Sequence, residues 1–346
     1  MEPAHRAWLE RGAEAALDPE QPICDPHHHL WADDPAYALW DRPAGPYTLA
    51  DLRSDTGSGH RVVQTVFVEC LSGYRTSGPE HLRSVGETEA AAAAAAESEC
   101  TAAEGSVIAA IVGSTDLRSA AVETALAAHV GAAGGRFRGV RHIVACDPSP
   151  DIPSGYTDPF PGMLADRSFR AGVAALGRAG LSFDAWLYHP QLGELTELAR
   201  AVPEVRIVVD HLGGPLAVGP FAGRRPEVLQ AWRSSMRELA TCPNVSVKLG
   251  GIGNPYLGPG WRHRPEPPSS EELAELWGPE IRWVIETFGV DRCMFESNFP
   301  VDRRSVGYSA LWNTFKRIVA GASETEKAAL FHDTAVATYR LGRAPA

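Results

Sequence analysis

The feature that most constrains the fold of this chain is a regular alternation of short apolar, β-branched segments with helical segments along its 346 residues. Apolar segments of this length that end at turn residues are typical of buried strands. Eight are present, at residues 23–30, 62–70, 107–112, 138–146, 182–189, 205–211, 244–249 and 292–299. Helical periodicity is found in the alanine-rich stretch 86–105 and in 119–135, 168–180, 192–203, 227–243 and 323–341. Eight such units predict a single-domain α/β protein, a (β/α)8 TIM-like barrel.

Composition excludes several classes of protein. The formal net charge of −11 has the wrong sign for a surface that tracks phosphates, so we expect no nucleic-acid partner. No apolar run approaches the roughly 20 residues that span a bilayer, and the N-terminus has no uninterrupted apolar segment of a secretory signal. The six cysteines are widely spaced, which favours reduced core thiols. We expect a cytoplasmic protein that acts on a small molecule and has no membrane partner, with a homo-oligomer as the candidate assembly.

Three consecutive histidines lie at the end of the first predicted strand, in ICDPHHHLW at residues 23–31. Side chains alternate along a strand, so Asp25, His27 and His29 are predicted to share one face. His28 is then predicted to face the helical layer. The Cα atoms of His27 and His29 would lie roughly 6.6 Å apart, close enough for both rings to meet one ion or one substrate group.

Other predicted strands also end in ionisable or amide residues. They are His189 after the fifth strand, His211 after the sixth, and Glu296, Asn298 and Asp302 at and after the eighth. The carboxyl ends of the strands are where a TIM barrel places its active site, so we expect these side chains to gather there. The long irregular stretch 250–270 follows the seventh strand and is predicted to cover the same mouth.

The motifs DPHHHLW, YHPQL, VVDHLGGP, VKLGG and CMFESNFPVD resemble those of the amidohydrolase superfamily, in particular the amidohydrolase-2 branch with its lactonases and non-oxidative decarboxylases. The resemblance covers residues 21–341 and leaves 1–20 as an N-terminal extension. It implies a TIM-like barrel in which His27, His29 and His189 bind a divalent metal, Zn²⁺ being the first choice, and His211 is the catalytic histidine. Some lactonases of this family act without a metal.

The chain departs from that family on the eighth strand, where it has Ser-Asn-Phe-Pro at 297–300 in place of Ser-Asp-Trp-Pro or Ser-Asp-Phe-Pro. The family's aspartate contacts the metal and takes a proton from the attacking water. Asn298 is uncharged and has no carboxylate to protonate. We therefore expect weaker metal binding and a general base elsewhere.

Three carboxylates are candidates for that base. Glu296 has the phase of Asn298 on the eighth strand, Glu69 ends the second strand, and Asp302 follows in the loop. Burial in a barrel mouth raises the pKa of a carboxylate towards neutrality, which suits a base. The alternative for Glu296 and Glu69 is an ion pair inside the barrel, with a partner such as Arg141 or Lys248.

Basic and aromatic residues near the predicted mouth indicate the kind of ligand. These candidate substrate-binding residues are Tyr74, Arg75, Arg141, His142, Lys248, Trp261, Arg262 and His263. Together they favour a carboxylate-bearing or oxygen-rich ring.

Lactone hydrolysis is the leading functional hypothesis. A metal-dependent non-oxidative decarboxylase is the second, although Asn298 counts against it because the eighth-strand acid is normally present there. The third is a metal-free barrel that is not a hydrolase but a lyase, an isomerase or a binding protein.

Overall fold

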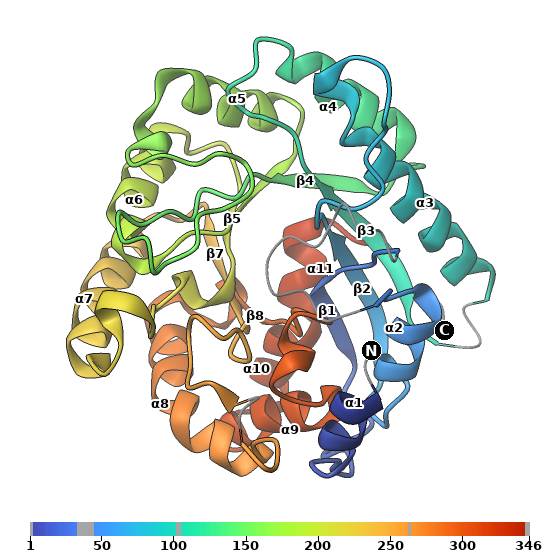
Figure 1. Cartoon of the computed structure of the whole chain (residues 1–346), viewed down its shortest axis with the longest axis vertical. Coiled ribbons are helices and arrows are strands. Elements are labelled where there is room, and N and C mark those ends of the chain that lie inside the picture. The colour runs from blue at the N-terminus through green and yellow to red at the C-terminus, as the bar shows by residue number, and fades with distance from the viewer. Residues whose placement is uncertain (1–2, 33–44, 102–104, 262–263, 343–346) are drawn as a thin grey trace.

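The chain folds into a barrel of parallel strands in the computed structural model, which describes residues 3–32, 45–101, 105–261 and 264–342. The strands are β1 (Ile23–His28), β2 (Val62–Val68), β3 (Val107–Gly113), β4 (Phe137–Arg141), β5 (Ser182–Ala185), β6 (Ile207–Val209), β7 (Val245–Leu249) and β8 (Cys293–Phe295). They pair in chain order from β1 to β8. The barrel closes where His29 N–H donates to Phe299 O (2.8 Å) and Asn298 N–H donates to His27 O (2.9 Å). The predicted (β/α)8 fold is therefore confirmed (Figure 1).

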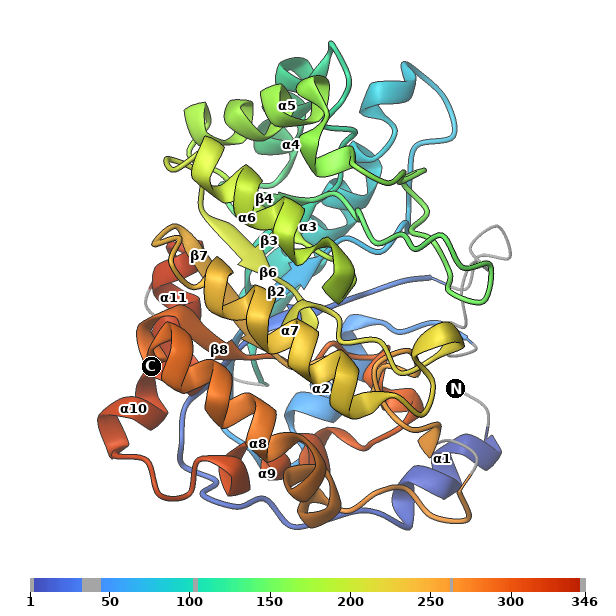
Figure 2. The same cartoon turned by 90° about the vertical axis from the view of Figure 1, so that its left-hand side faces the viewer.

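Helices surround the barrel (Figures 1 and 2). They are α1 (Pro3–Glu10), α2 (Leu49–Thr56), α3 (Val85–Cys100), α4 (Val122–Ala132), α5 (Arg167–Arg178), α6 (Leu192–Ala201), α7 (Arg225–Leu239), α8 (Ser270–Phe288), α9 (Tyr308–Ile318), α10 (Glu324–Ala328) and α11 (Thr334–Tyr339). Figure 2 shows α6, α7 and α8 side by side on one flank. Arg225 of α7 lies 3.4 Å from Glu280 of α8 and stacks over Trp277, which ties those two helices together.

The core has an inner and an outer layer. The outer layer lies between strands and helices, whereas Cys24, Val66, Val208 and Met294 pack together inside the barrel. Tyr339 of α11 joins this inner cluster, and its hydroxyl donates to Asp184 Oδ2 (2.5 Å). Residues directly after α11 contact the amino ends of the strands, since Arg340 donates to Gly180 O just before β5 and Gln64 of β2 donates to Gly342 O (3.0 Å). The carboxyl ends are left as the open side.

The first strand is irregular, and this changes one prediction. Cys24 packs inside the barrel, but Asp25 accepts a hydrogen bond from Tyr308 OH of α9 (3.0 Å), so it faces outward. The register of β1 against β2 shifts between Asp25 and His28, around Pro26, which has no N–H for the ladder. Strict alternation was therefore wrong for Asp25, because the bulge restarts the phase before His27.

The residues after α1 connect the N-terminus to the helical layer. Glu14 accepts hydrogen bonds from Ser270 N–H (2.7 Å) and from Asn313 Nδ2 (3.0 Å), so it joins α8 to α9. None of the six cysteines forms a disulfide and five are buried, as expected for core thiols. Among the described residues, no helix combines the length and apolarity needed to cross a bilayer.

Candidate active site

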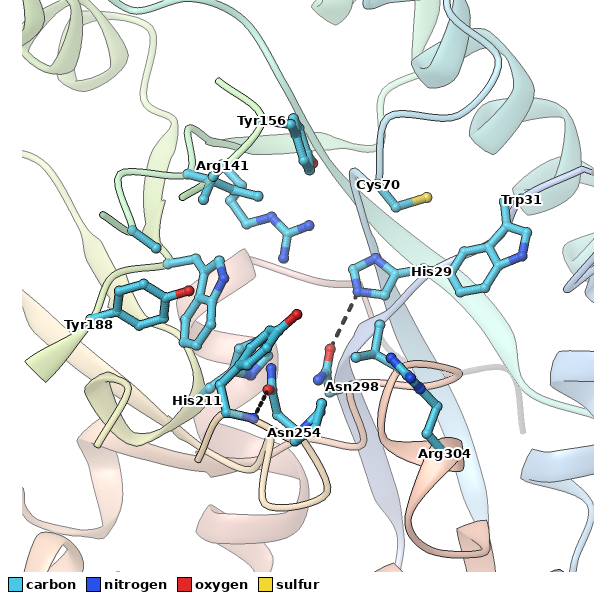
Figure 3. Close-up of a pocket in the computed structure, with 17 residues that line it drawn as sticks. His29, Trp31, Cys70, Arg141, Tyr156, Tyr188, His211, Asn254, Asn298 and Arg304 are labelled. Atoms are coloured by element: carbon cyan, nitrogen blue, oxygen red, sulfur yellow. Dashed lines mark hydrogen bonds between the residues drawn. The ribbon is translucent and has the colours of Figure 1, made fainter. Parts of the chain in front are cut away.

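A cavity of about 140 Å³ opens at the carboxyl ends of the strands. Its chemically distinctive lining residues are His29, Trp31, Cys70, Arg141, Tyr156, Trp186, Tyr188, His211, Asn254, Tyr256, Asn298 and Arg304. Figure 3 shows Arg141, His29 and Asn298 turned towards one shared space. Two arginines but no aspartate or glutamate are found among the described residues that line it. The cavity therefore favours an anionic or oxygen-rich ligand.

The first-strand histidines converge from one side. The rings of His27 and His29 lie 4.9 Å apart, and the ring of His27 lies 4.7 Å from that of His211. His28 instead packs against Phe67 in the outer layer and contacts Thr65 Oγ1 through Nε2 (3.0 Å). His28 thus faces the helical layer, as predicted.

Glu296 holds two imidazoles at once. Its Oε1 lies 2.7 Å from His211 Nδ1, and its Oε2 lies 2.7 Å from His27 Nδ1. Burial would raise the pKa of Glu296, but its electrostatic and hydrogen-bond interactions with His211 and then with His27 lower it to about 2. Burial likewise would lower the pKa of His211, but Glu296 raises it above the ordinary 6.5. The pair is therefore an imidazole oriented by a fixed anion, with His211 Nε2 left for the cavity.

Two backbone turns direct side chains into the cavity. His211 (φ +53°) and Asn298 (φ +54°) both have left-handed backbone, which is uncommon for residues other than glycine. The glycine at Gly251 is required next to this turn, because a Cβ there would lie 2.6 Å from His211 Cβ. Strained backbone of this kind is concentrated at functional sites, where the surrounding structure holds it.

His29 is held as a neutral acceptor. Its Nδ1 donates to Val68 O (2.8 Å), which can only accept. Burial and then the charge of Arg141 lower the pKa of His29 well below its ordinary value, so Nε2 presents a lone pair. Asn298 Oδ1 lies 3.4 Å from that nitrogen, because Asn298 Nδ2 donates to Asp302 Oδ1 (2.8 Å). Two acceptors this close together suit a donor that contacts both from the cavity, such as water or a substrate hydroxyl.

Arg141 and Glu69 form an ion pair, which is the alternative that the sequence left open. Arg141 Nε donates to Glu69 Oε1 (2.6 Å), and Arg141 NH2 donates to the carbonyl of Glu69. Tyr156 OH donates to the other carboxylate oxygen of Glu69. Both oxygens of Glu69 are thus engaged, which argues against its use as a base.

A second buried cation lies deeper in the barrel. Lys248 Nζ is 3.0 Å from Asp184 Oδ2, 3.0 Å from Asp210 Oδ1 and 3.2 Å from His27 Nδ1. Its side chain has no solvent exposure. Lys248 therefore neutralises two carboxylates below the cavity. Its predicted role in binding substrate is untested, and its burial away from the cavity lining argues against that role.

Asp302 is buried beside the loop that follows β7. It accepts from Gly253 N–H (2.8 Å) and from Asn298 Nδ2. Burial raises its pKa to about 7. Since Asp302 does not line the cavity, it positions Asn298 and the loop more directly than it could activate water.

His189 lies away from the histidine cluster. Its Nδ1 accepts from Leu216 N–H (3.3 Å) and its ring packs 5.0 Å from Phe221. The physical reason is strand phase: Asp184 of β5 points into the barrel, and Trp186 and Tyr188 continue that phase into the cavity. His189 has the opposite phase.

The remaining predicted substrate residues do not line this cavity. Tyr74 is half-buried, and Arg75 is exposed and paired with Glu89 (3.2 Å). Trp261 packs in the outer core, although Asn254 and Tyr256 of the same 250–270 stretch do line the cavity.

Two further predictions concern His142 and residues 262–263. His142 accepts from Leu117 N–H through Nδ1 (3.2 Å) and packs against Phe169, so it faces the outer layer. Arg262 and His263 lie outside the described residues.

Several lining residues escaped the sequence predictions, among them Trp31, Cys70, Tyr156, Trp186, Tyr188 and Arg304. Trp186 and Tyr188 could have been found from the side-chain phase of β5. Arg304 could have been found because it lies in the same loop after the eighth strand as Asp302, which was predicted as a site residue. Tyr156 carries no such signal, because it lies in an irregular segment between β4 and α5.

Fold and site together define a TIM-barrel protein with a first-strand His-x-His pair at its mouth. The chain belongs to the amidohydrolase family, whose model matches residues 24–341. It is 33% identical over 332 residues to the uncharacterised protein y4mH of Sinorhizobium fredii, across 92% of this chain and 98% of that protein. It is 28% identical to an L-fucono-1,5-lactonase of Burkholderia ambifaria, across 81% and 80%. A crystal structure of an amidohydrolase from Burkholderia multivorans with bound zinc shares the fold, with a TM-score of 0.71, 24% identity and 92% and 99% coverage.

Whether a divalent metal, as the family resemblance implies, fits this site can be tested against the donor atoms at the barrel mouth. Ligand atoms of His27, Asp210 and His211 lie within 4.8 Å of one another, the spacing of a metal group. However, Lys248 Nζ lies 3.0 Å from Asp210 Oδ1, and Arg141 NH1 lies 3.3 Å from His27 Nε2 and 3.8 Å from Asp210 Oδ2. The donor atoms of His27 and Asp210 already contact the side-chain cations Arg141 and Lys248, so this arrangement does not fit a divalent ion.

Proposed function

We propose that this chain hydrolyses a lactone, a small cyclic ester that carries carboxylate or hydroxyl groups. The observation that carries the proposal is the pair of His211 and Glu296, which opens into a cavity lined by Arg141. The similarity to proteins named L-fucono-1,5-lactonase supports the same reaction. A metal-dependent decarboxylase is disfavoured, because the histidine and aspartate donors do not fit a divalent ion.

His211 is the general base in this proposal. Its Nδ1–H is directed at Glu296, so Nε2 carries the lone pair when the ring is neutral. Glu296 raises the pKa of His211 above the ordinary 6.5, which makes the neutral ring a stronger base. Nε2 takes a proton from water while the water oxygen attacks the ester carbonyl carbon.

Arg141 meets the negative charge that develops on the carbonyl oxygen. Three of its five N–H groups are used on Glu69 and His27, which leaves two for the cavity. When the tetrahedral intermediate collapses, the ring C–O bond breaks and the protonated His211 returns its proton to the leaving oxygen. The product is the open hydroxy acid.

The test is a screen of the purified protein against sugar-acid lactones and carboxylated lactones, with release of acid followed by a pH indicator. We expect turnover of at least one lactone, with kcat lowered at least about 100-fold in His211→Asn. Absence of turnover across both groups, or a smaller loss of kcat in His211→Asn, would contradict the proposal.

Arg304 is expected to set the preference for an anionic substrate. It lines the cavity opposite Arg141 and is partly exposed. A hydrogen bond to a charged group contributes about 1.5–3 kcal/mol, so Arg304→Ala should raise KM for a carboxylated lactone by at least about tenfold. KM for a neutral lactone should change little. Arg304→Lys tests charge alone, and Arg303→Ala is the matched control because Arg303 pairs with Asp55 outside the cavity.

A further inference from the structure

His27 has a side-chain cation on each of its two ring nitrogens. Lys248 Nζ lies 3.2 Å from Nδ1, and Arg141 NH1 lies 3.3 Å from Nε2. Both cations can only donate, so whichever nitrogen carries the lone pair of the neutral ring already faces a donor. A metal ion on Nε2 of His27 would therefore have to displace Arg141.

The guanidinium of Arg141 is held beside His27 by hydrogen bonds to other residues. Its Nε and NH2 are both held by Glu69, and Tyr156 holds Glu69 in turn. The side chain of Arg141 is only 6% exposed. Because three separate contacts define its plane, Arg141 cannot rotate away from His27 without leaving Glu69 buried and unpaired.

The positive charge of Arg141 also acts on Asp210. NH1 lies 3.8 Å from Oδ2 of Asp210, the carboxylate in the group of possible metal ligands that Asp210 forms with His27 and His211. Lys248 lies on the opposite oxygen of Asp210 (3.0 Å). A divalent ion here would face two fixed cations and no uncommitted carboxylate among the described residues around it.

We propose that the guanidinium of Arg141 takes the place of a metal ion in this barrel: it lies on the donors of His27 and Asp210, excludes a divalent cation, and supplies the positive charge that meets the substrate carbonyl. The role of Arg141 towards the substrate carbonyl rests on the proposed lactone hydrolysis. The exclusion of a metal ion does not, because it follows from the positions of the side chains alone.

Metal content is the direct test. Tag-free wild-type protein is dialysed against Zn²⁺ and then against buffer, and zinc is measured by mass spectrometry and calorimetric titration. We expect far less than one zinc per chain. One tightly bound zinc that His27→Ala and His211→Ala both lose would overturn the proposal, and this measurement needs no variant of Arg141.

Removing the charge should create the site. Arg141→Met and Arg141→Gln free His27 Nε2 and Asp210 Oδ2, so we expect about one zinc per chain, lost again when His27→Ala is added. Arg141→Lys keeps a cation and should bind no zinc. If the folded Met and Gln variants bind none, Arg141 is not what excludes the metal and the proposal fails.

Activity separates this inference from the proposed function. Chelator should leave wild-type lactone turnover unchanged, while Arg141→Met should lose turnover in metal-free buffer. Turnover that chelator abolishes and zinc restores would contradict the role of Arg141 but support lactone hydrolysis. The zinc measurements stand even if no lactone is a substrate.

Discussion

His211→Asn is expected to lower kcat for the lactone substrate by about 10²- to 10⁴-fold, the usual contribution of a general base. Asparagine keeps a polar side chain at the left-handed position of residue 211, so the fold should survive. The measurement is steady-state kinetics beside a thermal unfolding curve. A loss of activity that follows only a loss of folded protein would show a structural role for His211.

Glu296→Gln should separate orientation from charge at the same site. The base must be neutral to act, so kcat/KM of the wild type rises with pH through the pKa of His211, centred above 6.5. Removing the anion of Glu296 lowers that pKa, so the rise should move to lower pH while the plateau falls. Glu286→Gln, on the exposed face of α8, makes the same charge change and should leave the profile in place. An unshifted profile in Glu296→Gln would mean that another group titrates.

Lys248→Met should cost the largest amount of stability, about 3–5 kcal/mol, because it leaves buried carboxylates without their cation. Lys248 bridges Asp184 and Asp210, and all three side chains are fully buried. The free energy of unfolding is measured from urea curves. Asp210→Asn in the Lys248→Met background should recover part of the loss, since one buried charge is removed.

Lys327→Met is the matched control. Lys327 pairs with the exposed Glu324 on α10, and surface pairs contribute at most about 1 kcal/mol. An equally small effect of Lys248→Met would mean that water reaches Asp184 and Asp210 in the barrel.

The eight strands were predictable because each is a short apolar run between turn residues, but the lengths of several, the fifth, sixth and eighth above all, were overestimated. The fifth was predicted to reach His189, whereas pairing of β5 ends at Ala185. Beyond that point the backbone leaves the sheet at the barrel mouth. Side-chain phase survives this change, so Trp186 and Tyr188 enter the cavity although they are outside the strand.

Phase reasoning failed only where the backbone itself departs from regular geometry. It was right for His28, but wrong for Asp25, because the bulge around Pro26 lies between Asp25 and His27. It would also have turned His211 away from the cavity, since Asp210 has the inward phase of β6. The left-handed backbone at His211 brings the ring back.

The sequence by itself determined the eight strands, six of the helical segments that alternate with them, the histidines at strand ends and the neutral Asn298 on the eighth strand. Only the tertiary structure decided which side chains meet: Arg141 of β4 on His27 of β1, and Glu296 after β8 between His27 and His211. These residues are between 70 and 269 positions apart in sequence. Their contacts depend on barrel closure and on the stagger of the strands, which local patterns of hydrophobicity do not encode.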